Sequence, residues 1–271
     1  MTNNAIIGFT AETFIHSGCG QSQGAIDQPF AREQATNYPY IPGSSLKGAF
    51  RDYSRVDNFD TDEIFGKSDE AGNLLVSDLR LLLLPVRSLT SAYKWVTCPH
   101  ILGRLARDLD RSKTTSNNFE RLCTHAKIGT QGFDGKKLFL EELSFQGKDI
   151  NIDDKLFEVL TNLCDVIEDK DRVVIIEDDD FNWFAGNALS IQTRNKLDEN
   201  KATVKGALWH EENLPPDTIM YCLLGDRNTE KQAVKDIVKK ISKDKYLQTG
   251  GNETVGMGWF KMQEYKKGVE Q

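Results

Sequence analysis

The longest apolar stretch of the chain, LRLLLLPV at residues 79–86, limits the folds that the chain can adopt. It falls far short of the roughly 20 apolar residues that a bilayer-spanning helix needs. A short apolar run, here with Arg80 and Pro85 near its ends, is typical of a buried strand. We therefore expect no membrane span, and because the N-terminus has no charged-then-apolar leader, we do not expect secretion.

The chain is long enough, at 271 residues, for one large domain or two small ones with a sizeable core. No linker rich in Pro, Gly and Ser divides it and no internal repeat is visible, so we expect one elaborated domain over residues 1–271. Its five cysteines are odd in number, far apart and without a CxxC pair. Disulfides and structural zinc are therefore not expected, and reduced thiols in the cytoplasm are the default interpretation.

Periodicity predicts strands and helices in a mixed order. AIIGFTAETFI (5–15) alternates apolar and polar residues and predicts a first strand, followed by a long loop over about 16–42. A helix then begins at PGSSLKG, because Leu46, Phe50 and Tyr53 recur at helical spacing. The later predicted elements are strands in 73–86, a helix over 98–111, a strand over 136–145, a helix over 152–167, a strand in 171–178, strands over 187–225 with a polar tip near 195–204, an amphipathic helix over 229–245 and a final strand. This order predicts an α+β fold of the ferredoxin-like kind with long insertions.

The charge is unevenly distributed along the chain. A net charge of −7 argues at first against a nucleic-acid partner. The acidic segment at 165–180, however, is typical of a solvated face. The segment over 32–55 is locally basic, with Arg32, Lys47, Arg51 and Arg55 against Glu33 and Asp52. A basic groove on an acidic body is compatible with RNA binding.

GSSLKG (43–48) has the composition of a phosphate-binding helix start. Ser44 or Ser45 can cap the helix, and small residues let the backbone approach a phosphate. Lys47, with Arg51 one turn later, adds positive charge. A capped helix with solvated cations is the equally favoured alternative.

The loop before this helix carries His16 and Asp27. A His and an Asp can serve as acid and base when the 2′-oxygen of RNA attacks its own phosphorus. Asp27 can instead hold a divalent ion that neutralises phosphate charge. From spacing alone, two solvated polar side chains of a loop are the favoured interpretation.

Two further segments have weak patterns. GGNETVGMGW (250–259) favours a tight loop with glycines at positive φ, and a backbone surface for RNA formed by Gly250 and Gly251 is the alternative. WHEENLPPDT (209–218) favours a charged strand end before a turn, although Glu211 and Glu212 beside His210 could also form a metal or acid–base group.

Four segments, taken together and in this order, resemble the RAMP superfamily of CRISPR proteins: residues 16–52, 77–105, 206–218 and 247–260. IPGSSLKGAFRD is similar to several RAMP subunits. WVTCPHIL and LWHEENLPPDT resemble one of them in particular, the backbone subunit of the type III-B (Cmr) RNA-targeting effector complex. The resemblance covers about residues 5–262.

The resemblance implies a ferredoxin-like (RRM-like) core and an extended β-hairpin thumb, at roughly 187–215. It implies a protein that polymerises with further copies of itself along a guide RNA, beside other Cmr subunits. It also implies a divalent-metal-dependent endoribonuclease that cuts target RNA at regular intervals. By position, Asp27 is the acid required for cutting and the ligand of Mg²⁺ or Mn²⁺, and His16 matches a histidine of the same loop. Lys47, Arg51, Ser44, Ser45, Gly250 and Gly251 are then the expected RNA contacts.

Two alternatives remain within the same superfamily. One is a non-catalytic structural subunit of the filament. The other is a guide-processing ribonuclease, which would act alone on repeat RNA.

Overall fold

The computed structural model describes residues 3–20, 24–56, 60–112, 137–146 and 152–266. Its central sheet consists of β1 (Asn4–Ala11), β2 (Tyr40–Ile41), β3 (Leu74–Val76), β4 (Leu79–Arg87), β5 (Tyr93–Thr97), β8 (Val173–Ile175), β11 (Ile219–Asp226), β12 (Tyr246–Gln248) and β13 (Trp259–Glu264). The strands follow the order β12-β13-β1-β11-β4-β5-β8, with β2 also paired to β4 and β3 to β11. Only β5 and β8 run parallel among these described pairs. The predicted α+β class is confirmed.

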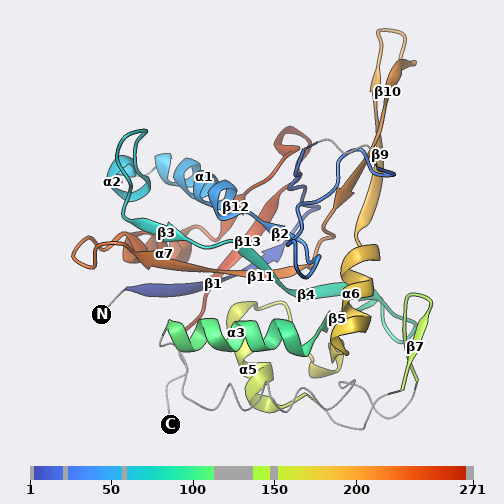
Figure 1. The fold of residues 1–271 in the computed structure, drawn as a ribbon, viewed down its shortest axis with the longest axis horizontal. Coiled ribbons are helices and arrows are strands. Elements are labelled where there is room, and N and C mark those ends of the chain that lie inside the picture. The colour runs from blue at the N-terminus through green and yellow to red at the C-terminus, as the bar shows by residue number, and fades with distance from the viewer. Residues whose placement is uncertain (1–2, 21–23, 57–59, 113–136, 147–151, 267–271) are drawn as a thin grey trace.

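Helices cover both faces of this sheet. Figure 1 shows α1 (Gly43–Tyr53) and α2 (Thr61–Phe65) on one side, and α3 (Pro99–Arg111) and α5 (Asp154–Leu163) on the other. One apolar cluster includes residues of α1, α2 and α7 (Ala233–Lys243), and a second includes residues of α3, α5 and α6 (Asp178–Asn187). Short 3₁₀ turns lie at Ser54–Val56, Lys170–Arg172 and Glu253–Val255.

The apolar run at 79–86 forms β4 in the middle of this arrangement. Leu79 belongs to the first cluster, and Leu81 to Leu84 belong to the second. These leucines are at most 3% exposed. Because both faces of the strand are covered, its sequence is a continuous apolar run rather than an alternation of apolar and polar residues. The predicted buried strand is confirmed.

Two segments fold differently from their prediction. The segment predicted as one strand over 136–145 contains, in its described part, a hairpin of β6 (Leu138–Leu140) and β7 (Leu143–Phe145), and Glu141 takes a positive φ of 49° in the turn. The acidic end of 165–180 is more than a solvated face, because it begins α6. Its three first-turn aspartates suit the positive end of the helix dipole, while Phe181 and Phe184 are fully buried.

A long hairpin of β9 (Ser190–Leu197) and β10 (Thr203–Asn213) projects from the body (Figure 1). Its tip falls at the predicted polar segment, where the Asp198 carboxylate accepts hydrogen bonds from the N–H groups of Asn200 and Ala202, both at 2.9 Å. Apolar side chains in the far part of the hairpin, Leu197 and Leu208, are at least half exposed. The far part of the hairpin therefore has no core of its own.

None of the helices in the described ranges is long and apolar enough to cross a membrane. Four of the five cysteines lie in those ranges, and all four are free thiols. Cys98, Cys164 and Cys222 are buried, and burial raises the pKa of the Cys98 and Cys164 thiols to about 12. The fifth, Cys123, lies outside the described residues.

Candidate functional site

The base of β10 holds the loop that carries Asp27. The Gln28 N–H donates to the His210 carbonyl at 3.0 Å, and the Glu212 N–H donates to the Gln28 carbonyl at 3.0 Å, as in a short parallel strand pair. The Ala31 N–H donates to the Ser17 carbonyl at 2.7 Å, which ties the two sides of the loop together. The described part of the loop is thus fixed to the body by backbone hydrogen bonds.

Asp27 lies half exposed beside His210. Its Oδ2 accepts a hydrogen bond from the His210 backbone N–H at 2.7 Å and lies 3.5 Å from His210 Nδ1. The hydrogen bond from this N–H is the main reason why the pKa of Asp27 is lowered from its ordinary value. Asp27 is therefore an ionised carboxylate at neutral pH, able to accept a proton or bind a cation but not to donate a proton.

His16 occupies a different environment, although it shares the loop with Asp27. It is 8% exposed, and its Nδ1 makes a 2.9 Å hydrogen bond with the Glu212 carbonyl. Because a carbonyl only accepts, Nδ1 carries the proton. The His16 carbonyl in turn accepts from the Gly251 N–H at 2.8 Å. His16 and Asp27 are thus attached to β10 two residues apart, with no direct contact between them among the described interactions.

Two buried carboxylates of β10 join four segments of the chain. Glu212, 4% exposed, accepts from the Phe30 N–H at 2.9 Å and pairs with Arg32 at 2.6 Å. Glu211, 1% exposed, accepts from Asn252 Nδ2 at 2.7 Å and lies 3.2 Å from Arg194 Nε. The favoured interpretation as a charged strand end was right about the strand end, but both charges are buried and paired.

A cleft of about 500 Å³ lies between the start of the loop, α1 and the glycine-rich loop. Its lining includes His16, Ser45, Gly250 and Gly251, so the fold brings together residues that are far apart in sequence. Gly250 has a φ of +93°, and a Cβ there would lie 2.4 Å from the His16 carbonyl oxygen. The predicted tight glycine loop is confirmed at this position, and its backbone also borders the cleft.

The start of α1 is capped from another part of the chain. Pro42 occupies the N-cap position, and no side chain of the helix start supplies a capping bond. Instead, Asp78 Oδ1 accepts from the Gly43 N–H at 2.7 Å. The prediction that Ser44 or Ser45 caps the helix is wrong, because the capping hydrogen bond is made by Asp78, in the segment before β4. Both serines are exposed.

The two predicted cations of α1 have different surroundings. Arg51 donates to the Gly66 carbonyl and to Asp62 Oδ1, both at 2.8 Å, and so holds α2. Burial lowers the pKa of Lys47, and the nearby charges of Arg227 and Arg51 lower it further. Lys47 therefore belongs to a cationic patch with Arg227, a residue that no sequence pattern singled out because it lies in the turn after β11.

The residues around Asp27 do not form a preformed metal cage. Within the ranges that the structure describes, no group of three or more His, Cys, Asp or Glu side chains is arranged to hold an ion. Asp27 has only the His210 imidazole beside it, and one of its oxygens already accepts from the His210 N–H.

Comparisons of sequence identify related proteins over nearly the whole chain. The family model of the RAMP superfamily matches residues 9–261. The chain is 34% identical to the CRISPR system Cmr endoribonuclease Cmr4 of Pyrococcus furiosus, over 95% of this chain and 94% of that protein. It is 25% identical to the CRISPR system CMR subunit Cmr4 of Saccharolobus solfataricus, over 92% of both.

Solved structures have the same fold. A crystal structure of Cmr4 has a TM-score of 0.70 at 28% identity and covers 98% of this chain and 100% of that one. A crystal structure of oligomeric Cmr4 from Pyrococcus furiosus has the same TM-score and identity, over 97% and 98%. The cryo-EM structure of the type III-B Cmr-beta complex bound to cognate target RNA contains a chain with a TM-score of 0.81 at 24% identity, with 97% of both chains covered.

Proposed function

Because the chain belongs to the RAMP superfamily and, within it, to the Cmr4 subunits, we propose that it is the backbone subunit of a type III-B CRISPR effector. In this role it binds guide RNA together with further copies of itself and other Cmr subunits, and it cleaves complementary target RNA at regular intervals. The observation that carries the proposal is the ionised, half-exposed Asp27 carboxylate, fixed at the base of a long projecting hairpin. We expect the protein in the cytoplasm, where its free cysteines would stay reduced.

The sheet order supports a ferredoxin-like core as part of this proposal. The four strands β13-β1-β11-β4 are neighbours in the sheet, α1 lies between β1 and β4 in the chain, and α7 lies between β11 and β13. This is a βαββαβ arrangement with the remaining elements as insertions. The longest projecting insertion, β9–β10, corresponds to the proposed thumb, and its exposed Ile191 and Leu208 suit contact with unstacked bases.

The proposed grip on guide RNA does not need to read its sequence. Lys47 and Arg227 supply positive charge near α1. Ser45, Gly250 and Gly251 line the cleft with small side chains, which let a ligand approach the backbone closely. Such a surface binds phosphates and backbone shape, while base pairing with the guide selects the target. Ser44 and Arg51 remain proposed RNA contacts, and the Arg51 guanidinium also donates to Asp62 of α2 and to the Gly66 carbonyl.

The proposed reaction uses the 2′-hydroxyl of the target strand as the nucleophile. Asp27, an ionised carboxylate, takes the 2′-hydroxyl proton as the oxygen attacks phosphorus. The bond from phosphorus to the 5′-oxygen breaks, and that oxygen leaves with a proton from solvent water, which reaches the half-exposed side chains of Asp27 and His210. The products are a 2′,3′-cyclic phosphate and a 5′-hydroxyl. His16 would act by positioning, because it is buried and holds β10 against the glycine-rich loop.

We also propose that cleavage requires Mg²⁺ or Mn²⁺. Among the described side chains, Asp27 and the neighbouring His210 form no group of three or more ligands and do not by themselves fit such an ion. No step of the reaction above is therefore routed through the metal.

The substitution Asp27→Ala in the assembled complex tests the proposal. We expect guide and target binding to be unchanged, because Asp27 is half exposed, and target cleavage to fall at least about a hundredfold. Asp69→Ala, which removes another exposed carboxylate, is the control and should cut normally. Normal cutting by the Asp27 variant would leave the chain a structural subunit, with cleavage done elsewhere in the complex. Cutting of repeat RNA by the isolated chain would indicate a guide-processing enzyme instead.

A further inference from the structure

One face of α3 carries a row of basic side chains. His100, Arg104, Arg107 and Arg111 are spaced at i, i+4, i+7 and i+11, which places them on one side of the helix. The opposite side, which includes Leu102, Leu105 and Leu109, is buried in the core. The row is about 16 Å long, from 1.5 Å of rise per residue.

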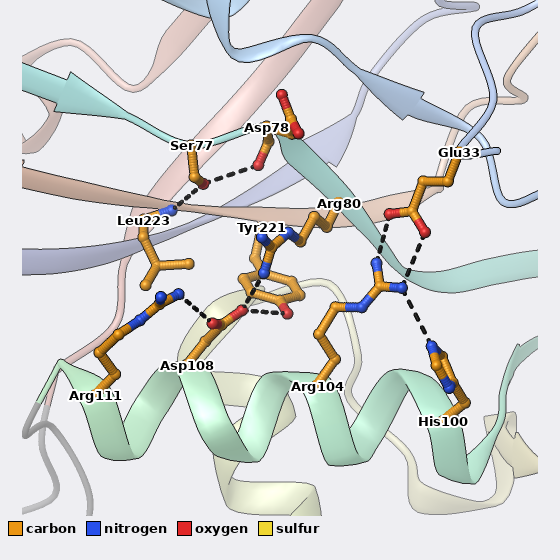
Figure 2. A network of polar contacts seen from close by, with 10 residues as sticks. All are labelled: Glu33, Ser77, Asp78, Arg80, His100, Arg104, Asp108, Arg111, Tyr221 and Leu223. Carbon is orange, nitrogen blue, oxygen red and sulfur yellow. Dashed lines mark hydrogen bonds and ion pairs between the residues drawn. The ribbon is translucent and has the colours of Figure 1, made fainter. Parts of the chain in front are cut away.

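This row borders a cleft that the proposed function does not use. The cleft has a volume of about 610 Å³ and is lined on the α3 side by Arg104, Arg107, Asp108 and Arg111. The other side is formed by Glu33, Tyr40, Asp78 and Arg80. Figure 2 shows the charged side chains of α3 facing those of β4 and of the loop before β2. Asp78, which lines this cleft, also accepts the hydrogen bond from the Gly43 N–H at the start of α1.

Ion pairs inside the cleft hold its arginines in place. The buried Asp108 carboxylate accepts from Arg80 at 2.6 Å, from Arg111 at 2.7 Å and from the Tyr221 hydroxyl at 2.9 Å (Figure 2). Glu33 is bound by both terminal nitrogens of Arg104. Asp108 is thus shared by Arg80 and Arg111, whereas Glu33 pairs with Arg104 alone.

The lining of the cleft carries a small net positive charge, which the exposed Asp78 partly offsets. Arg107 is exposed and has no hydrogen-bond or ion-pair partner within the described parts of the chain. Arg111 keeps 66% of its side chain exposed despite its bond to Asp108. Four arginines face three carboxylates here, on a protein whose net charge is −7. The guanidinium group binds phosphate oxygens through paired N–H donors, which favours phosphate as the ligand of such a row.

We propose that the α3 cleft is a second binding surface for the RNA backbone, with Arg107 and Arg111 as its phosphate contacts. The inference rests on the proposed function, because it supposes a chain that binds RNA. The lining favours RNA over a protein partner, since it consists of charged side chains and one tyrosine and has no apolar anchor of the kind found in the centre of protein interfaces. Over about 16 Å, a single strand presents several phosphates to the row.

Salt dependence of RNA binding by the full-length chain tests this surface. The probe is a fluorescent single-stranded RNA of mixed sequence, titrated at several KCl concentrations. The double variant Arg107→Ala/Arg111→Ala should bind several-fold more weakly and lower the slope of log K against log salt by about 1.4, at about 0.7 for each lost phosphate contact. Arg107→Glu should weaken binding without affecting folding, because Arg107 is exposed and has no described partner.

Two further variants make the outcome decisive. Arg87→Ala is the control, because Arg87 is 74% exposed at the far end of β4, about 23 Å along the strand from Arg80. Lys47→Ala reports on the proposed function.

Weaker binding by Lys47→Ala together with normal slope and affinity in both arginine variants would overturn the second surface alone. Failure of the unaltered chain to bind RNA would overturn both proposals. Normal RNA binding with loss of assembly between copies would identify the cleft as a protein contact, which also overturns it.

Discussion

The two predicted catalytic side chains of the loop before α1 differ in what surrounds them. His16 is buried between β10 and the glycine-rich loop, with both its ring and its carbonyl engaged. Asp27 is half exposed, and one backbone N–H is directed at its carboxylate. Two positions 11 residues apart in one loop therefore have different roles. Packing and fixed partners make His16 part of the framework, while exposure with a lowered pKa makes Asp27 available for chemistry.

The largest effect on the framework is expected for Glu212→Ala. The change leaves Arg32 without its carboxylate and the Phe30 N–H without an acceptor, in a site where both partners are largely buried. Breaking such a pair costs about 3–5 kcal/mol of unfolding free energy. Urea unfolding of the purified chain measures it. Glu212→Gln, which keeps an acceptor for Phe30, should lose less, and an equal loss would mean that the charge is not what matters.

Gly250→Ala should be the next most costly change. Its positive φ and the 2.4 Å approach of a new Cβ to the His16 carbonyl both oppose a side chain. Backbone strain of this kind costs about 1–3 kcal/mol. Gly251→Ala is a matched control, because a Cβ there meets nothing closer than 3.5 Å. Thermal melting of both variants measures the difference. Equal melting temperatures would show that the loop can shift to accommodate a Cβ at position 250 without loss of stability.

His16→Ala tests the comparison directly against Asp27→Ala. Loss of the hydrogen bond to the Glu212 carbonyl leaves a buried acceptor unsatisfied, at a cost of about 1–3 kcal/mol. Asp27→Ala should change the free energy of unfolding much less than His16→Ala does, as substitutions at exposed positions usually do. Chemical denaturation of the two variants gives the difference. A stable His16 variant that binds RNA but does not cut would instead give His16 a role in the reaction itself.

The smallest effect is expected from mild acid. The pKa of Asp27 lies below its ordinary value of 3.8, so its carboxylate stays ionised as the pH falls from 8 to 5 and protonates only below 3.8. Any stability that depends on its ionisation is likewise complete above 3.8 and is lost only as the pH falls through the lowered value. Single-turnover cleavage between pH 5 and 8 should therefore show no rise that reports protonation of this base. A rise with a midpoint near pH 6 would assign the base to another group.

Much of the local structure follows from short-range patterns. The spacing of Leu46, Phe50 and Tyr53 predicts α1, the apolar run predicts β4, and the polar tip predicts the turn between β9 and β10. The same kind of pattern was present but missed in α6, where Phe181, Phe184 and Ala185 recur at helical spacing after three aspartates. Periodicity works in these places because each residue's face depends only on its neighbours a few positions away.

The site depends on contacts that no spacing reports. Asp78 caps α1 from 35 residues away in the chain, and Asn252 reaches Glu211 across 41. The charge of Arg227, in the turn after β11, acts on Lys47, which lies 180 residues earlier in the chain. The basic row of α3 is visible in the sequence, but the cleft beside it exists only when β4 and the loop before β2 close over it.

Local patterns were sufficient to predict α1, β4 and the turn between β9 and β10, the tight loop at Gly250 and the place of Asp27 in a long loop. They did not show that this loop lies along β10, that His16 is buried while Asp27 is half exposed, or that Glu211 and Glu212 are paired inside the protein. The reason is physical: local backbone preference acts over a few residues, whereas burial and ion pairing depend on which distant segments the folded chain brings together.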